Sequence, residues 1–352
     1  MGPRATGPRR MALHGAGAGA LARLQLGAQP VESQSGILSS GNSREDGALI
    51  RAPRPPMTAP NIDVRAATRR FDRAASTYVE VAVLAREVER RMAGRLHYMR
   101  HDPQWVLDAG CGPGEGLGLL REHYPKARLI GLDIAQAMTR SARQARTILG
   151  RVRDFLSGAT RHHVCADLAH LPLAPASVAM VWSNLALPWA ADPLPAFSEL
   201  ARVLEPRGLL MFSTYGPDTL KELRGAFAGV DGYAHVHRFI DMHDLGDMLI
   251  AAGFADPVMD MEIVTLAYTE VGALTRDLRL SGQSNVEAGR RRGLMAPNAW
   301  AKMTSAYEAS RRDGRLPATF EIVYGHAWKG AQKIRTDGAR VVKTDFVLNK
   351  TK

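Results

Sequence analysis

Short apolar segments alternate with helical patterns along the middle of the chain, and this alternation limits the fold more than any other feature. Helical patterns separate the segments, and the one over 192–204 begins with Asp192-Pro193, a favourable N-cap and first-turn pair. Such alternation is typical of an α/β protein whose parallel sheet is covered by helices on both faces. Five segments have the length and composition of buried strands: 105–110, 127–134, 162–167, 177–184 and 208–216.

Further elements are predicted on either side of this core. Before it, apolar residues recur at helical spacing from Phe71 to Leu96, which predicts an amphipathic helix. We expect one folded domain over 61–328, followed by a basic tail over 329–352. After the core, helices are expected near 241–252, 270–280 and 297–312, and strands over 257–268 and 318–328.

The N-terminal segment, residues 1–60, differs from the rest in composition. It is rich in Gly, Ala, Pro, Ser and Arg and has no long apolar periodicity, which favours disorder. One interpretation is a mis-assigned start, with Met57 as the first residue of a cytoplasmic protein. The other is a mitochondrial transit peptide over 1–56, because the opening contains arginine and lacks acidic residues.

The net charge of +11 lies mostly in the two ends of the chain. Residues 1–56 account for +4 and residues 329–352 for +5, which leaves +2 on the folded part. The high isoelectric point therefore does not indicate a nucleic-acid-binding surface on the domain. No apolar run approaches the ~18 residues of a membrane helix, so a membrane-spanning protein is excluded.

A glycine-rich loop follows the first predicted strand. The sequence Asp108-Ala-Gly110-Cys-Gly112-Pro-Gly114 places glycines at alternate positions, where the backbone turns tightly and approaches a ligand without an intervening Cβ. The loop does not match the G-x-G-x-x-G fingerprint of dinucleotide-binding proteins, because Glu115 stands where the third glycine would fall. That carboxylate would repel a pyrophosphate, so NAD and FAD fit poorly.

Acidic residues also follow the next two strands. Asp133, at the end of the second strand, can accept hydrogen bonds from both hydroxyls of a ribose. Asp167 and Leu168, after the third strand, are placed to meet a base. For both aspartates the alternative is a helix N-cap. Ligands of open parallel sheets bind beyond the carboxyl ends of the strands, where these residues lie.

Taken together, these segments resemble a class I S-adenosylmethionine-dependent methyltransferase. The matching stretches are VLDAGCGPGEGLG, LIGLDIA, CADLAHLPL, VAMVWSNLALPW and RVLEPRGLLMFST, over roughly residues 68–216. The resemblance implies a Rossmann-like, seven-stranded sheet whose last strand, near 318–328, is antiparallel. It implies S-adenosyl-L-methionine as cofactor, held by Asp108, Gly110, Gly112, Gly114, Asp133, Ile134, Asp167, Leu168 and Asn184.

Two further stretches indicate the methyl acceptor. The N-terminal RRFDRAASTYVEVAVLAREV and the segment after the fourth strand resemble the malonyl-acyl-carrier-protein O-methyltransferase family of biotin synthesis. Such enzymes esterify the free carboxylate of a malonyl thioester. The resemblance implies that Tyr78, on a lid helix, and Arg238 act at the acceptor, and that the partner is an acyl carrier protein. Structural alternatives are a core position for Tyr78 and a surface ion pair with Asp241 or Asp244 for Arg238.

Other interpretations of the sequence stay open. The C-terminal half, with DLGDMLIAAGF and LPATFEIVYGHAW, resembles a mitochondrial complex I assembly factor with protein-arginine hydroxylase activity on the same fold. A non-catalytic cofactor-binding protein is a third interpretation.

The remaining candidate residues are histidines, cysteines and arginines. His235, His237 and His243 lack further ligands nearby, so no metal site is expected. Cys111 and Cys165 have no C-x-x-C spacing and are expected to be small buried residues. The basic clusters 290–292 and 311–315 are candidates for contact with an acidic carrier protein.

Overall fold

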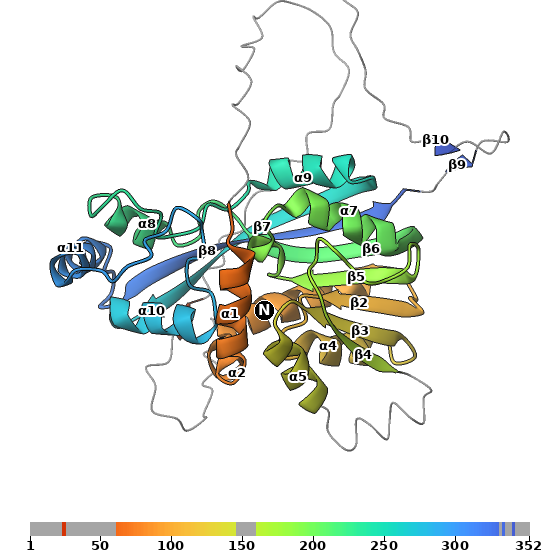
Figure 1. Cartoon of the computed structure of the whole chain (residues 1–352), viewed down its shortest axis with the longest axis horizontal. Helices are drawn as coiled ribbons and strands as arrows, with labels where there is room; N and C mark the ends of the chain where they lie inside the picture. The colour runs from red at the N-terminus through yellow and green to blue at the C-terminus, as the bar shows by residue number, and fades with distance from the viewer. Residues whose placement is uncertain (1–22, 26–60, 146–159, 331–332, 335–339, 342–352) are drawn as a thin grey trace, which may run out of the picture.

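A mixed sheet of eight strands organises the residues that the computed structural model describes, namely 23–25, 61–145, 160–330, 333–334 and 340–341 (Figure 1). The strands β2 to β6 run parallel to one another, whereas β8 runs antiparallel to both β6 and β7. In order across the sheet they are β4 (Arg161–Cys165), β3 (Arg128–Asp133), β2 (Trp105–Ala109), β5 (Val178–Asn184), β6 (Leu204–Tyr215), β8 (Leu316–Lys329), β7 (Phe254–Tyr268) and β1 (Arg23–Gln25).

The order of the strands determines where a ligand binds. The parallel part of the sheet starts at its middle with β2, adds β3 and β4 on one side, and then crosses to β5 and β6 on the other. The switch lies between β2 and β5, and parallel sheets form their ligand crevices at the carboxyl ends of such strands. The predicted mostly parallel, seven-stranded sheet with an antiparallel last strand, here β8, is confirmed.

The eighth strand, β1, comes from the segment in which disorder was predicted. Residues 23–25 pair antiparallel with residues 265–267 of β7. A sheet edge presents unpaired backbone groups and accepts such a strand without requiring a periodic apolar pattern in it. The prediction for residues 1–60 therefore fails at this strand, and the remainder of that segment lies outside the described residues.

Helices cover both faces of the sheet, as the strand pattern predicts. On one face, Val106 of β2 belongs to a buried cluster with residues of α3 (Val83–Arg95) and α4 (Glu115–His123). On the other, Leu107 packs in a cluster with α7 (Pro193–Val203) and α9 (Met242–Ala251). The remaining long helices are α5 (Gln136–Gln144), α8 (Lys221–Phe227), α10 (Val271–Leu280) and α11 (Pro297–Glu308).

The single helix predicted from Phe71 to Leu96 is wrong, because the chain forms three helices there. They are α1 (Val64–Ala74), α2 (Tyr78–Val81) and α3. At the first break the Thr77 hydroxyl lies 3.2 Å from the carbonyl of Ala74 and 2.8 Å from that of Leu280, at the end of α10. Threonine hydroxyls compete with helical backbone bonding in this way. The break places Tyr78 at the start of a short helix.

Of the predicted basic tail, the structure describes an antiparallel pair of two-residue strands, β9 (Lys333–Ile334) and β10 (Arg340–Val341). Among the described residues, no helix has the length and apolar content that crossing a bilayer requires.

Candidate active site

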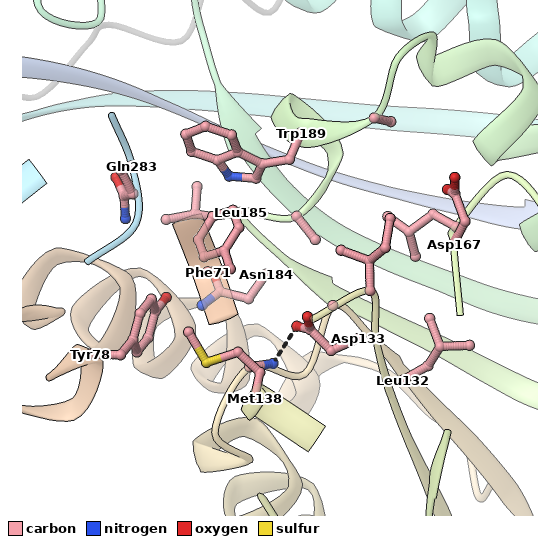
Figure 2. Close-up of a pocket in the computed structure, with 16 residues that line it drawn as sticks. Phe71, Tyr78, Leu132, Asp133, Met138, Asp167, Asn184, Leu185, Trp189 and Gln283 are labelled. Atoms are coloured by element: carbon pink, nitrogen blue, oxygen red, sulfur yellow. Dashed lines mark hydrogen bonds between the residues drawn. The ribbon is translucent and has the colours of Figure 1, made fainter. Parts of the chain in front are cut away.

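An open cavity with a volume of about 690 Å³ lies at the carboxyl ends of β2, β3 and β5 (Figure 2). Eight of the residues predicted for the site line it: Tyr78, Gly110, Gly112, Asp133, Ile134, Asp167, Leu168 and Asn184. The structure therefore brings together residues from five segments of the sequence.

The glycine loop forms one wall of this cavity. Gly110, Gly112 and Gly114 have φ values of +88°, +50° and +93°, in the left-handed region that favours glycine. A Cβ on Gly110 would also collide with the Cβ of Ala186. Gly110 and Gly112 line the cavity, whereas Gly114 is not in its lining and packs against α5, where a Cβ would lie 3.0 Å from that of Ala142. The first two glycines therefore face a ligand, and the third serves helix packing.

Asp133 ends β3 with its carboxylate at the cavity. Its Oδ2 accepts a hydrogen bond from the backbone N–H of Gly112 at 3.0 Å, and its Oδ1 accepts one from Ala135 at 2.8 Å. Burial raises the pKa of this carboxyl to about 6, although the two backbone donors oppose the shift. These two backbone hydrogen bonds hold the side chain in place. Because each carboxylate oxygen has a second lone pair, it can still accept hydrogen bonds from two hydroxyls of a ligand.

Asp167 and Asn184 line the cavity with polar groups that the scaffold also uses. The Oδ1 of Asp167 accepts from the backbone N–H of Ala169 at 3.0 Å. Asn184 donates to the carbonyl of Ala85 at 3.0 Å, and its Oδ1 accepts from the Ser213 hydroxyl at 2.7 Å. Asn184 therefore joins α3 to the ends of β5 and β6, and its amide is engaged within the protein.

Asp108 is fully buried and does not line the cavity. Within the described part of the chain its Oδ2 has no hydrogen-bond partner, and burial beside Glu89 raises its pKa well above the usual range. Glu89, on α3, accepts from the Trp182 indole N–H at 3.3 Å, and burial raises its pKa to about 7. Both carboxyls are among the nearest atoms to a Cβ placed on Gly116. Glu89 was not predicted as a site residue, although an acidic residue between the apolar helix positions Val88 and Met92 is a recognisable sign of a buried carboxyl.

Most of the cavity wall opposite Asp133 consists of residues that were not predicted from the sequence. Phe71 of α1 and Trp189 meet edge to face with ring centroids 5.0 Å apart, and Met138 and Gln283 complete this side. The Gln283 Oε1 accepts a 2.9 Å hydrogen bond from the Tyr215 hydroxyl. Figure 2 shows Tyr78 and Gln283 on the opposite side of the cavity from Asp133 and Asp167. Burial raises the pKa of Tyr78, so its hydroxyl stays protonated near neutral pH.

Arg238 stands apart from these residues. It is absent from the lining of the cavity, its side chain is 64% exposed, and its Nε and Nη2 donate to Oε1 of the buried Glu287 at 3.2 and 3.1 Å. The residue thus forms an ion pair, although with Glu287 and not with Asp241 or Asp244. A role for Arg238 at the acceptor stays a prediction.

The histidines and cysteines behave as scaffold residues. His235 pairs with Asp231 at 2.7 Å, and the Nε2 of His237 accepts from the backbone N–H of Val286 at 2.7 Å. Over the described ranges no cluster of His, Cys, Asp and Glu is suited to a metal ion. Cys111 is buried as expected, but Cys165 is exposed, because its side chain lies at the outer edge strand β4.

Comparisons with known proteins define the class. Residues 107–212 match the model of a family described as a methyltransferase domain. Over 276 residues the chain is 54% identical to a malonyl-[acyl-carrier protein] O-methyltransferase of Laribacter hongkongensis, covering 78% of this chain and 93% of that protein. A protein of the same name from Gallionella capsiferriformans is 52% identical over 287 residues, covering 82% and 98%. The chain belongs to the malonyl-[acyl-carrier protein] O-methyltransferase family, as predicted, and the resemblance to a protein-arginine hydroxylase is not favoured.

Proposed function

We propose that the protein transfers a methyl group from S-adenosyl-L-methionine to the free carboxylate of a malonyl group carried by an acyl carrier protein, as a step in biotin synthesis. The principal support is the membership in this family together with a cavity whose polar groups suit a nucleoside at one end and a small anion at the other. When bound, the cofactor supplies an activated methyl group on a sulfonium.

The residues of the cavity fit this cofactor. Asp133 offers two fixed acceptor oxygens for the ribose hydroxyls. Gly110 and Gly112 line the cavity, and the open space beside Gly112 leaves room for the methionine part against the backbone. Ile134, Asp167 and Leu168 line the region next to Asp133, where an adenine would lie. Asp108 and Glu89 lie buried behind the loop, so we assign them support of the loop and no direct contact with the ligand.

The proposed reaction needs no catalytic base. A malonyl carboxylate is ionised at neutral pH and has no proton to lose before it attacks. Tyr78 and Gln283 provide neutral donors on the side opposite Asp133, and Phe71 and Trp189 limit the access of water. Catalysis then rests on in-line positioning of two reactants in a dry cavity.

The surface arginines give less support for a docking site on the carrier protein. Arg290 is bound to Asp63 at 2.8 Å, Arg291 reaches Asp231 at 3.4 Å, and Arg311 is bound to Glu308 at 2.7 Å. The carrier protein as partner is therefore supported by the family of the chain and not by these arginines. A cytoplasmic location stays a prediction, and a transit peptide over 1–56 lies outside the described residues except at 23–25.

Intact-mass analysis of malonyl carrier protein after incubation with the purified protein and the cofactor tests this proposal. We expect a gain of one methyl group on the malonyl group, so cleavage of the thioester with hydroxylamine should remove the added mass together with that group. Holo carrier protein without the malonyl group is the control and should be unchanged. A wild-type protein that binds the cofactor and leaves malonyl carrier protein unmethylated would contradict the proposal, and addition of one oxygen to an arginine of a partner would favour the hydroxylase.

A further inference from the structure

A second cavity, with a volume of about 420 Å³, opens beside the first. It lies beyond the end of β6, between α8, α10 and the extended segment 235–239. Trp189 and Gln283 line both cavities. The Trp189 ring meets Phe71 of the first cavity at 5.0 Å and His237 of the second at 5.1 Å. The Trp189 and Gln283 side chains therefore form the boundary between the first and the second cavity.

The second cavity is lined without a single Asp, Glu, Lys or Arg side chain among the described residues. Its floor is apolar, with Leu223, Leu278 and Phe320. His237 is 4% exposed, and burial together with the nearby Arg70 and Arg290 lowers its pKa to about 4, so its ring is neutral. Because Nε2 accepts from Val286, the ring proton is on Nδ1. The chamber thus suits an uncharged group with a few polar atoms.

We propose that this second cavity binds the uncharged thioester and the start of the amide-containing arm of the acceptor, while the free carboxylate stays at the Trp189–Gln283 boundary. The assignment rests on the proposed function. A malonyl group has one methylene between its carboxylate and its thioester, so the thioester must lie within a few ångströms of the methyl donor. The second cavity adjoins the first directly, because Trp189 and Gln283 line both, and Figure 2 shows Gln283 on the side of the first cavity opposite Asp133.

The absence of charged side chains from the described lining of the second cavity also implies selectivity between acceptors. A free dicarboxylate would place its second carboxylate in a space that no charged side chain of the described residues lines, which is strongly unfavourable. Arg70 and Arg290 are near enough to affect His237, but neither lines the cavity and so neither can pair directly with a carboxylate there. A thioester presents only neutral atoms there. The chamber therefore selects mono-anionic acyl thioesters over free diacids, and the Tyr215 bond that orients Gln283 holds the amide donor at the boundary.

The test has two parts. The first compares two acceptors with wild-type protein, and the second compares the wild type with a variant whose second cavity is filled. Wild-type protein should methylate malonyl-N-acetylcysteamine with a kcat/KM at least 100-fold above that for free malonate. Ser284 lines the second cavity and not the first. We expect Ser284→Phe to fill the chamber, to lower kcat/KM for the thioester at least tenfold, and to leave the Kd for S-adenosylhomocysteine within about twofold. The control is Ile250→Phe, which adds a similar ring at a position 59% exposed on α9.

The outcomes separate the two proposals. An active wild type that prefers free malonate, or a folded Ser284→Phe variant that keeps its kcat/KM for the thioester, would overturn the assignment of the chamber alone. A wild type that methylates no malonyl thioester would overturn the proposed function and this assignment together. The comparison of the two acceptors uses wild-type protein, so it decides the matter even where Ser284→Phe does not fold.

Discussion

The charge of Asp133 offers a direct test of cofactor binding through pH. Its carboxyl is 9% exposed, and burial raises its pKa in the free protein from the ordinary 3.8 to about 6. Ribose hydroxyls donate to the ionised form, so cofactor binding requires loss of this proton. Below pH 6 the Kd for S-adenosylhomocysteine should then rise about tenfold for each pH unit, because the ionised fraction falls tenfold.

The same shift affects stability with the opposite sign. Since the folded pKa is raised, Asp133 contributes to the stability of the free protein below about pH 4, and this contribution is lost as the pH rises through about 6. Hydrogen bonds from the cofactor favour the ionised form and offset this loss. The thermal stabilisation by S-adenosylhomocysteine should therefore be larger at pH 7 than at pH 5.

Two variants isolate the charge. Asp133→Asn keeps an acceptor oxygen and has no titratable proton, so its Kd should be weaker than that of the wild type at pH 7 and nearly independent of pH between about 5 and 7. Asp133→Ala removes both acceptors and should weaken binding by about 2–3 kcal/mol, or roughly 30- to 150-fold. Titration calorimetry at three pH values measures all three proteins. A wild-type Kd without pH dependence, or an Asp133→Asn variant with the wild-type slope, would refute this role.

The remaining predictions concern the acceptor side and the scaffold. Tyr78→Phe should lower kcat/KM for malonyl carrier protein about tenfold with unchanged cofactor affinity, and an unchanged kcat/KM would remove Tyr78 from the site. Arg238→Ala should raise KM while kcat stays within about threefold, whereas a collapse of kcat would indicate contact with the reacting carboxylate. Gly114→Ala should cost about 1–3 kcal/mol in the free energy of unfolding, because φ is +93° and the space is filled by Ala142. Glu89→Gln should flatten the decline in melting temperature of the free protein between about pH 4.5 and 7, since the pKa of Glu89 is raised from 4.5 to about 7 and its contribution is lost over that interval.

The parts of the site that the sequence predicted share one property. The glycine loop and Asp133 each come directly after a buried strand, so a local pattern places them at the same edge of the sheet. The parallel sheet followed from alternation in the same way, because buried strands and amphipathic helices have different periods. The antiparallel last strand, β8, came from the family resemblance, and the order of the strands was not predicted, since no local pattern encodes either of them.

The parts that escaped prediction depend on contacts between distant segments. Phe71, Trp189 and Gln283 meet in one wall although more than 90 residues separate each from the next. Each alone is an ordinary core or loop residue. The break at Thr77 likewise depends on the carbonyl of Leu280, which local helical periodicity does not reveal. Arg238 shows the converse, because its neighbours His237 and Phe239 line the second cavity while its own side chain reaches Glu287.

The position of Arg238 is consistent with the chemistry of the proposed reaction. Methyl transfer from a sulfonium to a carboxylate brings together a positive and a negative charge and ends with neither, so the transition state is less charged than the bound reactants. A guanidinium held tightly on the carboxylate would stabilise the reactants more than the transition state and would slow the step. Neutral donors such as Tyr78 and Gln283, which line the cavity, would orient the anion at a smaller cost to its reactivity. The uncharged lining of the second cavity extends the same principle, because it admits the acceptor as a mono-anion whose single charge is consumed in the reaction.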